Sequence, residues 1–128
     1  MLLRKEFEFE AAHNLLHYHG KCEALHGHTY RLAVVLEGTP DAEGMVLDFS
    51  ELSRIVKERV VSRLDHAYVN DIIEQPTAEN IASWVWDQIE ELVLRPNCRL
   101  SSVEVWETRT NGAILRAEDR VKNSRLEK

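Results

Sequence analysis

Residues 21–36 read KCEALHGHTYRLAVVL, and the second half of this stretch has the alternation of a β-strand. Four apolar residues share one parity, so their side chains point to one side of the strand: Tyr30, Leu32, Val34 and Leu36. The same parity continues backwards to His28 and His26, with a single glycine between them. An apolar strand face that begins with two imidazoles needs a chemical explanation.

A second alternating stretch precedes the first. Residues 3–13, LRKEFEFEAAH, place phenylalanines on one side and glutamates on the other, and their apolar side ends at His13. We expect a half-buried strand that pairs with a strand at 26–37 through a loop at 14–25. Antiparallel pairing would gather three imidazoles at one end of the sheet, those of His13, His26 and His28.

Three neutral imidazoles with an open fourth position are a typical arrangement for catalytic zinc. The spacing therefore predicts zinc ligands at His13, His26 and His28. The alternative is that the histidines bind no metal, because a lone H-x-H pair is a weak signal. His17 and His19 form a rival H-x-H pair, but they fall in a predicted loop with no strand to orient them.

The rest of the chain predicts two helices and two more strands. One helix is capped by Asp48 or Ser50 and runs to about Leu64, and the second is capped by Thr77 and runs to about Leu94. Two short strands follow, separated by turn residues at 110–112. The order β-β-α-α-β-β predicts an α+β domain with a four-stranded antiparallel sheet and two helices on one face. Its open edges favour pairing between subunits, so we expect a homo-oligomer.

Composition bounds the functional class. The 128 residues suit a single domain, 1–128, with a core at about 3–117 and a charged tail at 118–128. The net charge of −6 argues against a nucleic-acid partner, and no apolar run is long enough to span a membrane. The N-terminus carries charge too early for a secretory signal, and Cys22 and Cys98 make no disulfide framework. We therefore expect a cytoplasmic protein.

Further residues suggest chemistry beside the histidines. Cys22 either closes the metal site as a fourth ligand or acts beside the metal as a base or nucleophile. Asp65 and His66 are either a helix-end histidine with a solvated aspartate, which the residues alone favour, or an acid/base pair. Glu107 continues an apolar row and lies either in water or in a pocket, where it needs a partner such as the guanidine-like edge of a ligand.

Six motifs occur together in the order and at the distances of one known family. They are FEFEAAH, C-x-x-x-H-G-H, G-M-V-L-D-F, L-D-H-A-Y-V-N, P-T-A-E-N and W-E-T. Over about residues 5–116 the chain resembles the 6-pyruvoyltetrahydropterin synthase superfamily. The resemblance is greatest to its 6-carboxy-5,6,7,8-tetrahydropterin synthase branch, because three residues separate Cys22 from His26.

The resemblance implies the tunnelling fold, or T-fold, with subunits joined edge to edge, commonly as hexamers made from two trimers. It implies that a zinc ion is bound by His13, His26 and His28 and that Cys22 is the catalytic cysteine. It implies that Asp65 and His66 form an acid/base pair. It also implies that the Glu107 carboxylate holds the 2-amino-pyrimidinone edge of a pterin, and that Thr77 and Glu79 lie in a segment that contributes to pterin binding.

The implied reaction converts 7,8-dihydroneopterin triphosphate to 6-carboxy-5,6,7,8-tetrahydropterin, acetaldehyde and triphosphate, a step in 7-deazaguanine and queuosine-type biosynthesis. One alternative is a pyruvoyltetrahydropterin synthase, which eliminates triphosphate. Another is cleavage to a hydroxymethyl pterin, associated with a glutamate near the cysteine, and Glu23 follows Cys22 here. A third is a non-catalytic pterin-binding module with structural zinc. Candidates for binding the triphosphate are Lys21, Arg109 and Arg116.

Overall fold

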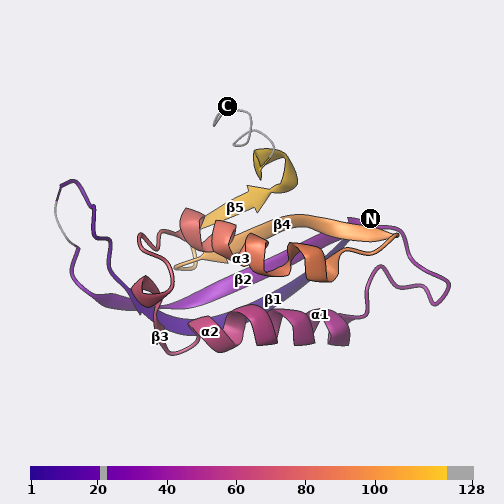
Figure 1. Cartoon of the computed structure of the whole chain (residues 1–128), viewed down its shortest axis with the longest axis horizontal. Coiled ribbons are helices and arrows are strands. Elements are labelled where there is room, and N and C mark those ends of the chain that lie inside the picture. Colours follow the sequence, from indigo (N-terminus) through magenta and orange to yellow (C-terminus); the bar gives the residue numbers. More distant parts are fainter. Residues whose placement is uncertain (21–22, 121–128) are drawn as a thin grey trace.

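The computed structural model describes residues 1–20 and 23–120, which form one mixed β-sheet with helices on one of its faces (Figure 1). The five strands lie in the order β3-β1-β2-β4-β5 across the sheet. Neighbouring strands pair antiparallel, except that β3 runs parallel to β1. The predicted α+β class is confirmed. The bounds of the strands are β1 Leu2–His13, β2 His26–Gly38, β3 Ala67–Tyr68, β4 Cys98–Trp106 and β5 Gly112–Arg116.

The strand β3 corrects the predicted four-stranded antiparallel sheet. It consists of Ala67 and Tyr68 only, which pair with Ala11 and Ala12 of β1. Two residues are too few to show an alternation, so the sequence predicts only a connection at 65–76. They become a strand because the chain leaves the preceding helix alongside β1, whose edge backbone groups need hydrogen-bond partners.

Two helical stretches cover the same face of the sheet (Figure 1). The first is α1 (Phe49–Val56), which continues through a π-helical turn, η1 (Lys57–Val61), into α2 (Ser62–Leu64). The second is α3 (Ala78–Val93), which follows a 3₁₀ turn, η2 (Val69–Asp71). The π-helical turn falls inside the stretch that the sequence predicts as one helix.

Both long helices begin at side-chain caps. The Asp48 carboxylate accepts a hydrogen bond from the Ser50 backbone N–H at 2.7 Å, and the Thr77 hydroxyl accepts one from the Asn80 N–H at 3.1 Å. Each cap satisfies a backbone donor that has no partner inside the helix. The predicted cap at Thr77 is confirmed, and Asp48 rather than Ser50 caps the first helix.

The hydrophobic core lies between the sheet and the helices. The strand residues predicted to point inward do so, and Phe9, Tyr30 and Leu32 are each 2% exposed or less. Apolar residues of both helices, among them Leu52 and Ile81, close the core from the other side. At one end of the sheet the core row of β1 ends in a buried histidine, and this end carries the candidate site.

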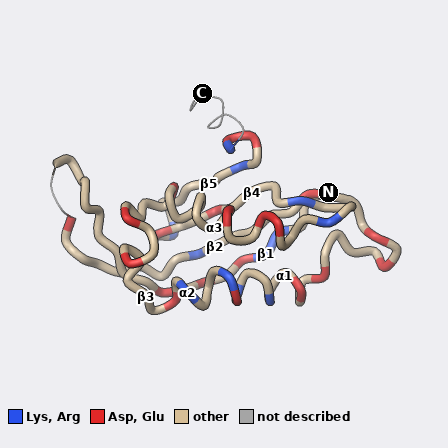
Figure 2. The backbone as a smooth tube through the Cα atoms, in the orientation of Figure 1, with Lys and Arg blue, Asp and Glu red and all other residues tan. Residues whose placement is uncertain are grey.

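Acidic and basic residues are interspersed along α1 and η1, whereas α3 carries acidic residues and neither Lys nor Arg (Figure 2). On the other face of the sheet, the Arg31 guanidinium lies 5.5 Å from the centre of the Trp106 ring, and Arg4 pairs with Glu104 at 3.4 Å. These long side chains explain why Ala33, on that face of β2, is also buried.

Two predictions concern the limits of the domain. Of the predicted charged tail, residues 118–120 are helical together with Ala117, and residues 121–128 lie outside the described residues. In the part of the chain that the structure describes, no helix is long and apolar enough to cross a membrane.

Candidate metal centre and ligand site

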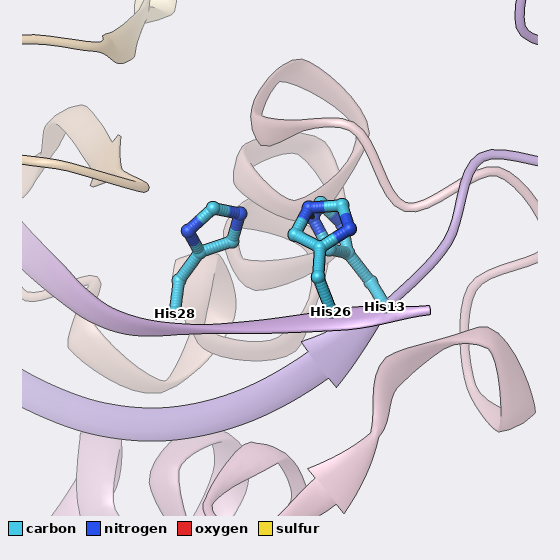
Figure 3. Close-up of side chains that lie close together, drawn as sticks. All are labelled: His13, His26 and His28. Atoms are coloured by element: carbon cyan, nitrogen blue, oxygen red, sulfur yellow. Dashed lines mark hydrogen bonds between the residues drawn. The ribbon is translucent and has the colours of Figure 1, made fainter. Parts of the chain in front are cut away.

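The register of β1 and β2 brings the three predicted histidines together. Antiparallel pairing places His13 opposite His26 and Ala11 opposite His28, at the end of the sheet where both strands meet the loop. Figure 3 shows the three rings on one side of the strands. The Nε2 atoms of His13 and His26 are 3.1 Å apart, and one ligand nitrogen from each histidine lies within 4.8 Å of the others.

Backbone carbonyls fix the tautomers of two of these rings. The His13 Nδ1–H donates to the Pro76 carbonyl oxygen at 2.8 Å, and the His26 Nδ1–H donates to that of Ala24 at 2.9 Å. A carbonyl can only accept, so in the neutral rings both Nε2 atoms carry lone pairs. Two lone pairs facing each other at 3.1 Å repel unless a cation lies between them.

The third histidine leaves a nitrogen free in the same place. The His28 Nε2 atom is buried and has no hydrogen-bond partner among the described residues. Burial is the largest effect on this ring and lowers its pKa, which favours the neutral form that binds metals. Tetrahedral zinc–nitrogen bonds of about 2.0–2.1 Å would set the nitrogens about 3.3 Å apart. The three histidines therefore fit a metal ion with imidazole ligands.

Two carboxylates lie near this cluster. The Glu107 Oε2 atom lies 4.0 Å from the His28 Nε2 atom, and the Glu23 Oε1 atom lies 3.7 Å from the His26 Nδ1 atom. Glu23 Oε1 is buried without a hydrogen-bond partner in the described ranges. Both carboxylates oppose the effect of burial by raising the pKa of His28. A bound cation, or a ligand with a positively polarised edge, would compensate the negative charge of these two carboxylates.

A cavity of about 290 Å³ lies next to Glu107. It is lined by the three residues predicted to bind a pterin, Thr77, Glu79 and Glu107, together with Asn111. The start of α3 supplies the first two, and the turn between β4 and β5 holds Glu107, whose backbone N–H donates to the Asn111 carbonyl at 2.9 Å. Residues almost thirty positions apart in the sequence thus share one wall beside the histidines.

Asp65 and His66 form a contact pair at the end of α2. The His66 Nδ1 and Asp65 Oδ2 atoms are 3.1 Å apart, and Asp65 Oδ1 accepts a hydrogen bond from the Glu10 backbone N–H at 2.9 Å. The Glu10 N–H, and after it His66, lower the pKa of the Asp65 carboxyl. His66 has a φ of 60°, which lies in the left-handed region. It lines a cleft of about 450 Å³ with His28.

The remaining candidate site residues either do not belong to the histidine cluster or fall outside the residues that the structure describes. Cys22 and Lys21 fall outside the described residues, so the neighbourhood is seen only from Glu23 onward. His17 and His19 lie exposed in the loop after β1 and do not belong to the cluster. The triphosphate candidates Arg109 and Arg116 are exposed, and Arg116 lies near Glu118 and Asp119.

Sequence reasoning missed the residues that hold the loop. The Gln75 side-chain oxygen accepts hydrogen bonds from the Leu16 and His17 backbone N–H groups at 2.9 and 3.3 Å. The Asn70 side chain accepts from the Asn14 N–H at 3.0 Å and donates to the Asn14 carbonyl at 2.8 Å. These amides replace the strand partner that the chain loses when β1 ends. The only signal for them in the sequence is that Asn70 and Gln75 lie in the connection between the two predicted helices.

Comparisons with known proteins identify the family of this chain. The family model described as 6-pyruvoyl tetrahydropterin synthase matches residues 2–118. The chain belongs to this family. The family predicted from the motifs is thereby confirmed, and the protein is a lyase-type enzyme similar to 6-carboxy-5,6,7,8-tetrahydropterin synthase.

Two relatives and one solved structure illustrate the match. The 6-carboxy-5,6,7,8-tetrahydropterin synthase of Synechocystis is 45% identical over 119 residues, covering 88% of this chain and 90% of that protein. A dihydroneopterin monophosphate aldolase of Pyrococcus furiosus is 41% identical over 93 residues, covering 73% of this chain and 79% of that protein. The 6-pyruvoyl tetrahydropterin synthase structure from Caenorhabditis elegans has a TM-score of 0.78 at 25% identity, covering 91% and 95% of the chains. The predicted T-fold is confirmed.

Proposed function

We propose that this protein converts 7,8-dihydroneopterin triphosphate and water to 6-carboxy-5,6,7,8-tetrahydropterin, acetaldehyde and triphosphate, with zinc at the three histidines. The observation that carries the proposal is the 4.0 Å approach of Glu107 to His28, which joins a metal-competent cluster to a cavity lined by Thr77 and Glu79. A pterin ring in the cavity would extend its 6-side chain toward the cluster.

Glu107 has the role of anchoring the pterin ring. A carboxylate can accept two parallel hydrogen bonds from the 2-amino group and the neighbouring ring N–H of a pterin. The Glu107 side chain is 25% exposed, so these bonds form partly out of water and gain strength. Its backbone is held by the turn to Asn111, which keeps the carboxylate at the cavity wall.

The catalytic residues act on protons of the pterin side chain. Zinc, when bound, would act as a Lewis acid toward the side-chain hydroxyls. Cys22 as a thiolate would take a proton from the side-chain carbon, and His66 would exchange protons on another face with Asp65 stabilising its charged form. The 3.1 Å contact between Asp65 and His66 supports the acid/base role of this pair.

The test is to incubate zinc-loaded protein with 7,8-dihydroneopterin triphosphate and to measure acetaldehyde together with the mass of the pterin product. Acetaldehyde with the 6-carboxy pterin is the expected result. A pyruvoyl product without acetaldehyde would assign the protein to the synthase that eliminates triphosphate. Unchanged substrate would favour a non-catalytic pterin-binding module.

A Cys22→Ala variant separates the two roles of the cysteine. We expect a folded protein that keeps its zinc and loses turnover, because three histidines suffice as ligands when the fourth position is open. Loss of zinc together with unfolding would instead assign Cys22 to a closed structural site.

A second candidate function rests on Glu23. Its buried Oε1 atom has no hydrogen-bond partner among the described residues and lies 3.7 Å from the His26 Nδ1 atom, on the side of the ring opposite the Nε2 atom that faces His13. Its charge raises the pKa of His28, so it is near enough to the cluster to serve as a base toward a ligand bound there. We infer a side activity that cleaves dihydroneopterin substrates to a hydroxymethyl pterin, as the name of the Pyrococcus furiosus relative suggests. Glu23→Gln should abolish the hydroxymethyl product and leave the acetaldehyde product; loss of both, with zinc retained, would reject a separate role.

The cellular setting follows from the proposed reaction. We propose that the product enters 7-deazaguanine and queuosine-type biosynthesis, that the protein works in the cytoplasm, and that it assembles as a homo-oligomer, a hexamer made from two trimers. The support is the family and the outer edges of β3 and β5, which bear no further strand within the described residues.

A further inference from the structure

Three buried polar side-chain atoms lack a hydrogen-bond partner among the described residues, and all three lie around the candidate site. They are Glu23 Oε1, His28 Nε2 and Tyr30 Oη. Buried polar groups normally have partners, so a group of orphans at one place points to a ligand that supplies the missing bonds. A bound metal ion would be the missing partner of His28 Nε2, and the proposed second activity gives Glu23 a role as a base. The Tyr30 hydroxyl has no role so far.

Tyr30 is held rigidly beside the metal ligands. It follows His28 by two residues on β2, so both side chains project from the same face of the strand. Its ring stacks on Phe9 with centroids 4.9 Å apart and lies edge-on to the His28 and His13 rings at 5.4 and 5.9 Å. The side chain is fully buried. The ring therefore cannot turn its hydroxyl toward water without disturbing the core.

The hydroxyl is a donor that lacks an acceptor. A tyrosine hydroxyl keeps its proton at neutral pH and can therefore donate a hydrogen bond. Neither Glu107 nor Glu23 comes within hydrogen-bond distance of it. A phenylalanine would make the same ring contacts without burying an unpaired hydroxyl, which is costly. The missing acceptor is therefore expected to come with a ligand.

We propose that Tyr30 is a positioning residue whose hydroxyl donates a hydrogen bond to an oxygen atom of the pterin's 6-side chain. The inference rests on the proposed function, because that function places the side chain beside the histidine cluster. Tyr30 then distinguishes pterins with a hydroxylated side chain from pterins with an alkyl one. Glu107 cannot make this distinction, because it faces the other end of the ring.

The test compares two stable pterins on the zinc-loaded protein by fluorescence titration. Neopterin carries a trihydroxypropyl side chain, and 6-methylpterin has no side-chain oxygen. Tyr30→Phe should weaken neopterin binding about tenfold and leave 6-methylpterin binding unchanged, because only the former loses a hydrogen bond. Zinc content should equal that of the wild type.

The melting temperature of the ligand-free variant supplies a second readout. Removing an unpaired buried hydroxyl should leave the melting temperature unchanged or raise it, whereas a hydroxyl with a structural partner would lower it. Tyr18→Phe, at an exposed tyrosine, is the matched control and should change none of these quantities. Unchanged neopterin affinity, equal weakening of both pterins, or a lower melting temperature would each overturn the role of Tyr30.

The same titrations separate this inference from the proposed function. Glu107→Gln should weaken both pterins alike, because both share the ring edge that Glu107 would hold. A wild-type protein that binds neither pterin would overturn the pterin function and the role of Tyr30 together. A wild-type protein that binds both, with Tyr30→Phe indistinguishable from it, would overturn the role of Tyr30 alone.

Discussion

Two backbone carbonyls decide what the site histidines can do. Each accepts the Nδ1–H of one ring, from His13 at Pro76 and from His26 at Ala24, and so turns the Nε2 lone pair toward the centre of the cluster. Hydrogen bonds of this kind orient metal ligands and raise their basicity. The histidines themselves could be predicted from strand parity, but their tautomers could not, because Pro76 lies 63 residues from His13 in the sequence.

The anchor role of Glu107 gives a prediction at the same scale. Glu107→Gln should weaken pterin binding roughly 10- to 100-fold, because an amide cannot accept both hydrogen bonds and loses the charge that strengthens them. Zinc content, measured by atomic absorption, should not change, since Glu107 is not a ligand. Unaltered pterin affinity would reject the anchor, and loss of zinc would show that Glu107 supports the metal site instead.

Asp65 gives a prediction about pH. Its folded-state pKa lies below the ordinary value, so the ionised carboxylate stabilises the fold at pH above about 4, and this contribution is lost as the pH falls through the folded pKa. Asp65→Asn should therefore lower the melting temperature at pH 7 and differ less from the wild type near pH 3. A difference that stays constant across this range would show that charge is not the cause.

At the scale of elements, the connection between α2 and α3 organises the site although it has little regular structure. Gln75 holds the loop after β1, Pro76 holds His13, and Thr77 caps α3 and lines the pterin cavity. Three consecutive residues thus join the loop, the metal ligand and the ligand cavity. The caps were predictable from local sequence, whereas the contacts of Gln75 and Pro76 depend on the packing of two distant segments.

Removing the Gln75 amide should loosen the loop without unfolding the core. In Gln75→Ala the Leu16 and His17 N–H groups lose their acceptor, and we expect their local opening free energy to fall by about 1–2 kcal/mol. Hydrogen exchange of these amides measures the effect. The amides of β4 are the internal control and should exchange as in the wild type. Equal loss of protection in both places would mean that Gln75 supports the whole fold.

At the scale of the molecule, the sheet ends in two open edges within the described residues, β3 and β5. Edge strands of soluble proteins are usually covered or paired, so assembly through these edges is expected. Ile114 on β5 is 53% exposed, a large apolar side chain on a strand that pairs on one side only. The sequence predicts open edges, but which strand forms one of them, and in which direction it runs, depends on β3, which only the tertiary structure forms.

An oligomer is the corresponding prediction. Light scattering after size exclusion should give a mass of six subunits, and Ile114→Glu should shift the protein toward smaller species because it places charge in the expected interface. Ile114→Val should keep the wild-type mass. A monomer in the wild type would contradict the proposed assembly, and a hexamer that tolerates Ile114→Glu would place the interface elsewhere.

The sequence by itself determined the strand parities, the helix caps and the three histidines, since these follow from periods of two and 3.6 residues and from antiparallel pairing of neighbouring strands. The tertiary structure decided the tautomers, the direction of Glu23, the cavity wall shared by Thr77 and Glu107, and the unpartnered hydroxyl of Tyr30. These features depend on where the connection after α2 packs against the end of the sheet. No local pattern encodes that contact, because its partners are brought together only by burial of the common core.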